Sequence, residues 1–221
     1  MKAKELYATL VELKLYKRKN ECAELFIQYH LIRNDLDAAI RELTESSEQY
    51  KSCLGLLPVL VEIAHSNDQE RLEKVCSCAE KFSTPFQVRS TWLYALLENG
   101  KTEEAELFLQ KNNTELSGEL VDFVNFQAIQ RRKPKVFDAL LKMHKLKESV
   151  ILRENVLIGM AKTYMKLHDP QGLKSVWKML MAEDIILFSK AIGSIRDYFR
   201  RLNLAPPEVD EKKICIQPHH R

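Results

Sequence analysis

Glycine and proline are scarce in this sequence, with 6 Gly and 7 Pro among 221 residues. Turns that need special backbone geometry are therefore few, which disfavours a β-sandwich or a β-barrel. Leu, Glu, Lys and Ala are abundant instead, and all four are good helix formers. Together with 45% hydrophobic and 29% charged residues, this composition predicts an ordered, all-α chain.

Long apolar runs are also lacking. The longest candidate, residues 54–64, is interrupted by Pro58 and Glu62 and is far shorter than the roughly 18 residues of a membrane span. At the amino terminus, Lys2, Lys4 and Glu5 precede an amphipathic segment rather than the apolar core of a signal peptide. We therefore expect no membrane association.

The residue patterns of catalytic and metal sites are absent from the sequence. The five cysteines are odd in number and include no CxxC pair, which disfavours a disulfide framework and a zinc site. His65 has one candidate ligand partner one turn away, Glu62, and two ligands do not make a metal site. Neither a glycine-rich phosphate loop nor a nucleophile elbow occurs. The sequence predicts a protein that is not an enzyme and that has no metal, cofactor or small-molecule substrate.

Charge is distributed unequally along the chain, although the total is only +3. Residues 1–124 contain 15 Lys/Arg and 21 Asp/Glu, a net charge of −6, whereas residues 125–221 contain 19 and 10, a net charge of +9. Such asymmetry indicates either a second half that faces a polyanion or two solvated surfaces of different charge.

Polar breaks recur along the chain at nearly constant intervals. Their markers are Asn34, Asn67, Gly100, Lys133 and Asp169, spaced by 33, 33, 33 and 36 residues. This period is typical of stacked helical hairpins. We expect Asn34, Asn67 and Asp169 to cap the following helices, and Gly100 to end the preceding helix in a left-handed conformation.

The breaks divide the sequence into helices that precede a break, called A, and helices that follow one, called B. The predicted A helices are 20–32, 54–65, 86–98, 118–131 and 150–167. The predicted B helices are 35–47, 68–82, 101–111, 134–146 and 170–182. Since one hairpin cannot bury its own apolar surface, neighbouring hairpins must stack. The predicted fold is a right-handed α-solenoid of helix-turn-helix repeats over residues 1–203, with five hairpins in 20–182.

The two ends of the array depart from the hairpin pattern. Residues 3–16 read as a lone B helix without an A partner, from which we expect the natural chain to extend upstream. Residues 186–203 read as a final A helix. The segment 204–221, which follows with Ala205-Pro206-Pro207 and mixed charges, is expected to be a flexible tail.

Three segments resemble the pentatricopeptide-repeat family. These are residues 99–108 (NGKTEEAELF), residues 34–40 (NDLDAAI) and residues 3–7 (AKELY). The other units are degenerate; Leu72, for example, stands where a small residue is usual. Tetratricopeptide repeats have nearly the same period, but their tryptophan, leucine-glycine and tyrosine pattern is not evident.

The leucine-rich, degenerate units are similar to animal mitochondrial members of this family. That resemblance implies binding of single-stranded RNA, a role in messenger stability, mitochondrial localisation and a small RNA-binding protein as partner. The alternatives are a protein-interaction scaffold without RNA contact, and a nuclear or cytoplasmic location.

Candidate RNA-binding residues fall into two groups. The resemblance to pentatricopeptide repeats implies a base-facing position on helix A, about ten residues before the break, and among these positions only Ser90 resembles a base-reading residue. A basic strip across successive A helices either contacts phosphates without sequence preference or is an ordinary charged surface. Its members are Arg131, Arg132, Lys133, Lys135, Arg153, Lys162, Lys166, Arg196, Arg200 and Arg201.

Overall fold

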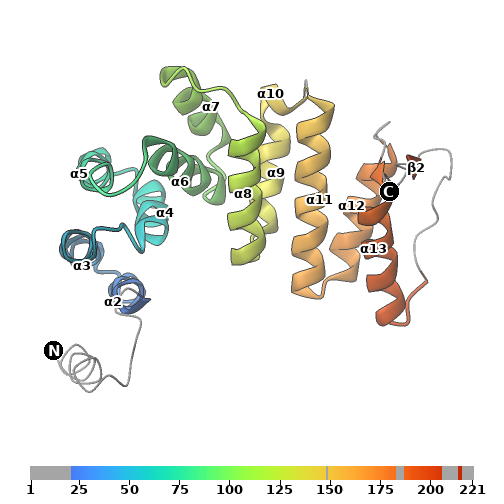
Figure 1. Cartoon of the computed structure of the whole chain (residues 1–221), viewed down its shortest axis with the longest axis horizontal. Coiled ribbons are helices and arrows are strands. Elements are labelled where there is room, and N and C mark those ends of the chain that lie inside the picture. The colour runs from blue at the N-terminus through green and yellow to red at the C-terminus, as the bar shows by residue number, and fades with distance from the viewer. Residues whose placement is uncertain (1–20, 148, 183–186, 206–213, 216–221) are drawn as a thin grey trace, which may run out of the picture. The chain divides into compact units, whose positions relative to one another are not determined.

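The computed structural model describes residues 21–147, 149–182, 187–205 and 214–215 (Figure 1). These residues form helices that pack consecutively, as expected for an α-helical repeat solenoid, so the all-α prediction is confirmed. The A helices are α2 (Glu21–Ile32), α4 (Leu56–Ser66), α6 (Pro85–Glu98), α8 (Gly118–Arg131), α11 (Val150–Leu167) and α13 (Ser189–Arg201). The B helices are α3 (Leu36–Tyr50), α5 (Gln69–Ala79), α7 (Thr102–Lys111), α9 (Pro134–Lys142) with the short α10 (His144–Lys147), and α12 (Pro170–Ala182).

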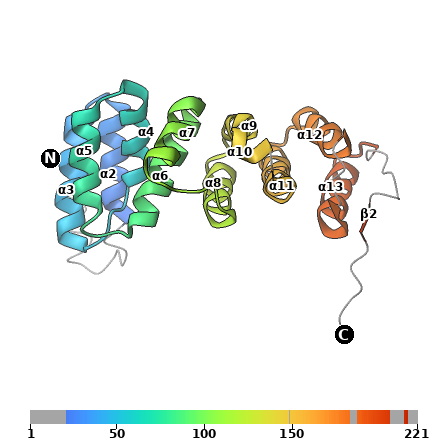
Figure 2. The ribbon, with the colours of Figure 1, turned by 90° about the horizontal axis from the view of Figure 1, so that it is seen from above.

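The chain forms two compact units, residues 1–95 and residues 96–221, with the boundary inside α6. In the first unit, α2 to α5 lie side by side along their lengths (Figure 2). In the second unit, α8, α11 and α13 form one layer, while α9 and α12 form the other (Figures 1 and 2). Each layer of this unit is thus made of helices of one kind, A or B.

One predicted helix is divided in two. The B helix expected at 134–146 ends at Lys142, because Met143 adopts an extended conformation with φ −62° and ψ 135°. The Met143 side chain is fully buried there, and α10 then resumes as a single helical turn. The other described helices begin and end within a few residues of their predicted bounds.

Parts of the two ends lie outside the described residues. They include all of the lone helix expected at 3–16 and most of the tail expected at 204–221.

Leu187–Phe188 (β1) pairs in parallel with Ile214–Cys215 (β2). The last A helix therefore begins later than the sequence predicts.

A residue with left-handed backbone follows each described A helix. These residues are Asn34, Asn67, Gly100, Arg132, His168 and Asn203, with φ between 55° and 73° and intervals of 33, 33, 32, 36 and 35 residues. At five of the six, the next backbone N–H donates to the carbonyl five residues before it, at 2.9 to 3.0 Å. This bond closes the helix end and satisfies a carbonyl that would otherwise be unpaired.

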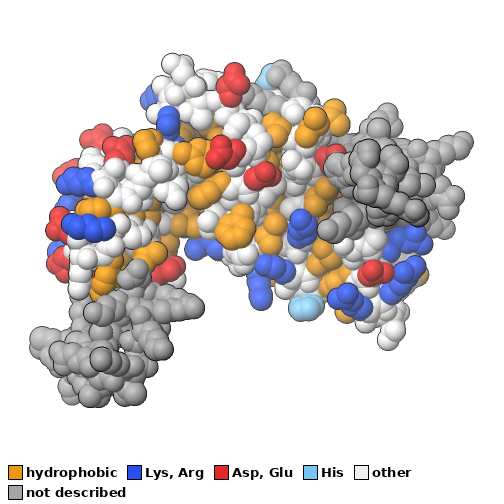
Figure 3. Space-filling view, viewed as in Figure 1, with side chains coloured by type: hydrophobic (Ala, Val, Ile, Leu, Met, Phe, Trp, Pro, Cys, Tyr) orange, Lys and Arg blue, Asp and Glu red, His pale blue; other side chains and the backbone are white. Residues whose placement is uncertain are grey.

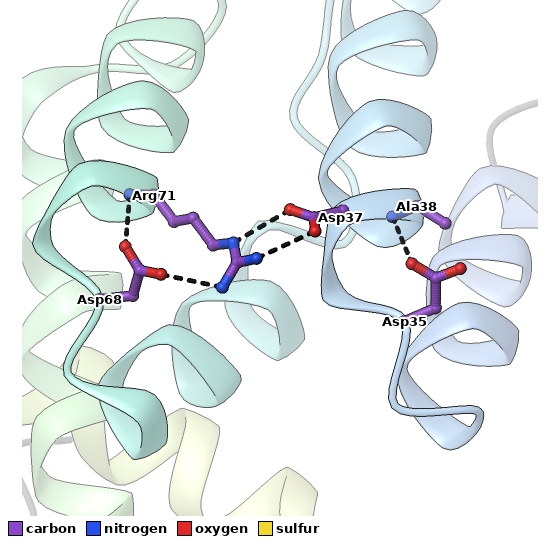
Figure 4. A network of polar contacts seen from close by, with 5 residues as sticks. All are labelled: Asp35, Asp37, Ala38, Asp68 and Arg71. Atoms are coloured by element: carbon purple, nitrogen blue, oxygen red, sulfur yellow. Dashed lines mark hydrogen bonds and ion pairs between the residues drawn. The ribbon is translucent and has the colours of Figure 1, made fainter.

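The capping prediction for two asparagines is wrong. Asn34 and Asn67 end the preceding helix, since Asn tolerates the left-handed conformation. The aspartates that follow them, Asp35 and Asp68, cap the next helix. Each carboxylate accepts from the backbone N–H three residues ahead, at 2.9 and 3.0 Å (Figure 4). The cap expected at Asp169 is confirmed by its bonds to two backbone N–H groups.

Successive B helices of the first unit are linked by one guanidinium. Arg71 on α5 donates to both carboxylate oxygens of Asp37 on α3, at 3.0 and 2.9 Å, and also to Asp68 at 2.8 Å (Figure 4). The hydrogen bond from Arg71 lowers the pKa of Asp37. Asp37 and Arg71 are 34 residues apart, one repeat, so the link joins nearly equivalent places in neighbouring hairpins.

The A helices α8 and α11 approach closely at Gly159. A Cβ at this position would lie 2.8 Å from Cε1 of Phe137 and 3.2 Å from Cγ of Asn125. Beside it, the Asn125 Nδ2 group donates to the backbone carbonyl of Asn155 at 3.1 Å. A glycine and one buried amide therefore set the spacing of these two helices.

Candidate functional site

Two of the predicted phosphate-binding residues are bound to a carboxylate. Glu98, at the end of α6, is 7% exposed and lies 3.2 Å from Nε of Arg131 and 3.0 Å from Nζ of Lys133. The Arg131 pairing is bidentate, because its second nitrogen donates to the other Glu98 oxygen at 3.3 Å. The break after α8 is thus attached to the end of the preceding A helix, 33 residues earlier.

The pKa of the Glu98 carboxyl is lowered despite its burial. Burial raises its pKa, but hydrogen bonds from Lys133 and Arg131 and their charges outweigh that effect, so the pKa is lowered overall. Both cations are held by a buried anion, and their charge is partly neutralised. Arg131 and Lys133 therefore serve the packing of the repeat more directly than they serve a ligand.

A groove of about 820 Å³ opens on the A-helix layer of the second unit. It is lined by residues of α8, α11 and α13 and of the breaks after them: Ile129, Gln130, Arg132, Lys162, Met165, Lys166, His168, Ser194, Asp197, Tyr198, Arg201 and Leu202. Four of the predicted residues meet here: Arg132, Lys162, Lys166 and Arg201. All four are exposed, and Figure 3 shows Lys and Arg side chains gathered along the lower edge of these helices.

The electrostatic balance of the groove is positive. Among its described lining residues, Asp197 alone carries a carboxyl group, and Arg200 donates to that group at 3.1 Å. The Nζ group of Lys166 donates to the Gln130 side chain at 3.4 Å, which joins α11 to α8 across the groove. The groove is therefore suited to an anion that spans several A helices.

The lining residues form rows that cross the A helices. Gln130, Lys166 and Arg201 are separated by 36 and 35 residues, the same intervals that separate the left-handed residues of these repeats. Arg132 and His168, which also line the groove, form a second row. Each row takes one residue from each repeat, so a linear ligand lying across the helices would meet one polar group per repeat.

The remaining strip residues lie outside this groove. Lys135 is in the first turn of α9, in the B layer. Arg153 is in the first turn of α11, at the opposite end from the groove. Arg200 pairs with Asp197, and the Nε atom of Arg196 is buried. The predicted basic strip is therefore reduced to its four members in the groove.

The base-reading role expected for Ser90 does not fit the structure. Ser90 is fully buried, and its hydroxyl donates to the carbonyl of Phe86 at 2.6 Å within α6. The corresponding position on α11, Gly159, is buried against Phe137. Both positions are buried, so neither Ser90 nor Gly159 is placed to contact a base.

Three lining or neighbouring residues were missed by the sequence reasoning. His168 directly follows α11, and its left-handed backbone places it in the groove. Tyr198 lines the groove. Phe126 on α8 is 57% exposed and lies on the same helix face as Ile129 and Gln130, three and four residues later. The sequence could have predicted the exposure of Phe126, because its helical spacing places it off the core face of α8.

A different surface occurs in the first unit. Leu25, Tyr29 and Ile32 on α2 are 58%, 52% and 82% exposed. Their spacing of four and three residues places them on one face of the helix. Arg33 lies 5.5 Å from the Tyr29 ring and donates to its hydroxyl. This apolar stripe is of the kind that protein partners cover.

The part of the chain that the structure describes contains neither a metal-binding cluster nor a helix fit to span a membrane. No three His, Cys, Asp or Glu side chains gather there in a way that could hold a metal ion. Within the same residues, no helix combines the length and apolar character needed to cross a membrane.

Comparison with known proteins shows a distant similarity. The chain is 22% identical over 198 residues to the leucine-rich PPR motif-containing protein, mitochondrial, of Xenopus tropicalis. The match covers 89% of this chain and 14% of that protein's length. No protein-family model and no solved structure matches the chain. The relation to pentatricopeptide proteins is thus supported at the level of a distant similarity.

Proposed function

We propose that this chain is a non-enzymatic, helical-repeat protein that binds single-stranded RNA through the basic groove of its second unit. The observation that carries the proposal is the meeting of Arg132, Lys162, Lys166 and Arg201 on the A-helix layer. Their exposed cationic groups are suited to phosphates. The similarity to a mitochondrial PPR protein supports the same class of ligand.

The expected mode of binding is independent of base sequence. The base-reading positions Ser90 and Gly159 are buried, whereas the groove offers Lys and Arg side chains, which recognise phosphate. Contacts of this kind fix the path of the backbone but carry no sequence information. We infer a role in the stability or expression of mitochondrial messenger RNA, with a small RNA-binding protein as a partner that adds selectivity.

Filter binding to a short single-stranded RNA tests the groove. Neutralising two of its cations, with Lys166→Gln and Arg201→Gln together, should reduce the dependence of log affinity on log salt by about 1.4, or about 0.7 per lost phosphate contact. At about 0.1 M salt this corresponds to a loss of roughly tenfold or more. Titrations at about 50 and about 200 mM salt measure both quantities.

The matched control carries the same change of net charge in the same unit. Lys174 and Lys178 are exposed on α12, in the B layer. The double variant Lys174→Gln with Lys178→Gln should bind RNA nearly as the wild type does. Equal losses in both double variants would indicate a diffuse effect of net charge, and no loss in the groove variant would contradict the proposed site.

The second candidate function is a protein-interaction scaffold, which the exposed stripe on α2 favours. If the stripe is the functional surface, Leu25→Ser with Ile32→Ser should abolish capture of a protein partner and leave RNA affinity unchanged. Crosslinking of the full-length protein in cells, with RNA and protein products both identified, distinguishes the two functions.

A further inference from the structure

Phe126 lies on α8, the helix that supplies Ile129 and Gln130 to the basic groove, and more than half of its surface is exposed. It is on α8, one helical turn before Gln130, and is 57% exposed. Figure 3 shows exposed hydrophobic side chains over α8 next to the basic edge. An aromatic ring this exposed on the A layer contributes little to the core.

The position of Phe126 follows from the register of α8 and α11. Gln130 accepts from Lys166 across these helices, an interval of 36 residues. The same interval takes Phe126 to Lys162, which lines the groove. Phe126 and Lys162 therefore occupy the row one helical turn before the row of Gln130, Lys166 and Arg201. An RNA strand whose phosphates contact the row of Gln130, Lys166 and Arg201 would place its bases over the row of Phe126 and Lys162.

We propose that Phe126 is a stacking platform for an unpaired base of the bound RNA. This inference rests on the proposed function, and it gives a physical reason why the RNA ligand is single-stranded rather than double-stranded. A base inside a duplex already stacks on its neighbours, whereas the open face of an unpaired base can lie on an aromatic ring. Stacking tolerates any base, because every base has a π-face. The groove and the ring together would therefore bind RNA tightly without selecting its sequence.

The test compares three ligands on one variant of the intact chain. Phe126→Ala should weaken binding of a single-stranded RNA by about 5- to 150-fold, the range typical of the loss of one stacking contact. Binding of an abasic oligonucleotide of equal length and charge should not change, and neither should binding of an RNA duplex. Leu107→Ala is the matched control, since Leu107 is 54% exposed on the B helix α7; it should alter none of the three affinities.

The outcomes separate this inference from the proposed function. If Lys166→Gln with Arg201→Gln weakens RNA binding and Phe126→Ala does not, RNA binding in the groove is supported and base stacking on Phe126 is contradicted. If Phe126→Ala weakens the abasic oligonucleotide equally, the ring acts on the shape of the groove and the inference also fails. If neither variant affects RNA binding, the proposed function fails with it. Circular dichroism of each variant establishes that the helices are retained.

Discussion

At the scale of single residues, Glu98 is the group whose loss we expect to destabilise the second unit. Glu98→Gln removes the charge that holds Arg131 and Lys133. The freed cations remain partly exposed, so the expected cost is about 1–2 kcal/mol, less than for a fully buried pair. Urea unfolding at pH 7 measures it. Glu104→Gln, which removes an exposed carboxylate paired with Lys101, should change the free energy of unfolding by less than about 0.5 kcal/mol.

Glu98 also makes the free energy of unfolding dependent on pH. The folded pKa of Glu98 lies below its usual value of 4.5, so its contribution to stability is complete above that value. The contribution is lost as pH falls through the folded pKa, because protonation removes the charge. The stability difference between wild type and Glu98→Gln should therefore shrink below about pH 4.5. A difference that is constant down to pH 3 would contradict this assignment.

Arg132 combines a strained backbone with a position in the groove. Its φ of 56° is unfavourable for a residue with a Cβ, whereas glycine adopts that conformation readily. Arg132→Gly should raise the free energy of unfolding by about 0.5–1 kcal/mol while weakening RNA binding. Asn34→Gly, at the equivalent place after α2, should give a smaller gain because Asn already tolerates the left-handed region. If Arg132→Gly lowered the free energy of unfolding as well as the affinity for RNA, the expected relief of backbone strain would be contradicted.

At the scale of helices, two glycines provide a matched comparison. Gly159→Ala on α11 would bring a methyl group 2.8 Å from the buried Phe137 ring, and overpacking of this kind costs about 1–3 kcal/mol. The gain in helix propensity, about 1 kcal/mol, offsets only part of that cost. Gly193→Ala on α13, where nothing lies within 4 Å, should instead stabilise the protein by up to about 1 kcal/mol. Thermal unfolding of both variants should give shifts of opposite sign.

Helix positions were predictable from the sequence because each boundary has its own chemical signal. Asn, Gly and Pro mark the breaks, and Ser117 begins α8 by accepting from the Leu120 N–H, as the predicted start requires. The division of α9 from α10 was not predictable, since Met143 is a good helix former and its extended backbone depends on burial of its side chain. Local signals thus define most helix ends, and tertiary packing decides the exceptions.

The site was less predictable than the helices. Arg131 and Arg132 are adjacent in sequence, yet one binds Glu98 and the other lines the groove. The difference arises from the left-handed turn at Arg132 and from a carboxylate 33 residues earlier, neither of which is visible in a run of basic residues. Composition could therefore predict that the second half is basic, but not which cations remain available to a ligand.

At the scale of the whole molecule, the unequal charge of the two halves predicts which half the proposed RNA ligand would contact. Residues 1–124 carry a net charge of −6 and residues 125–221 a net charge of +9, so a polyanion is repelled by the first half and attracted by the second. Ultraviolet crosslinking of the intact chain to single-stranded RNA should give adducts in peptides from residues 125–203. Equal yields of adducts from the acidic half would show that the charge asymmetry does not direct binding.

The left-handed residues after the A helices have a consequence for how such a chain can change in length. Five of the six described A-helix ends are closed by a backbone bond of their own, whatever side chain follows. Duplication or deletion of one complete period therefore leaves every boundary with its local signal and restores the packing of neighbours. An insertion of a few residues within a helix has no such boundary to absorb it and displaces every later side chain around the helix axis. Lineages of this protein should accordingly differ in length by whole repeats, with shorter insertions confined to the breaks.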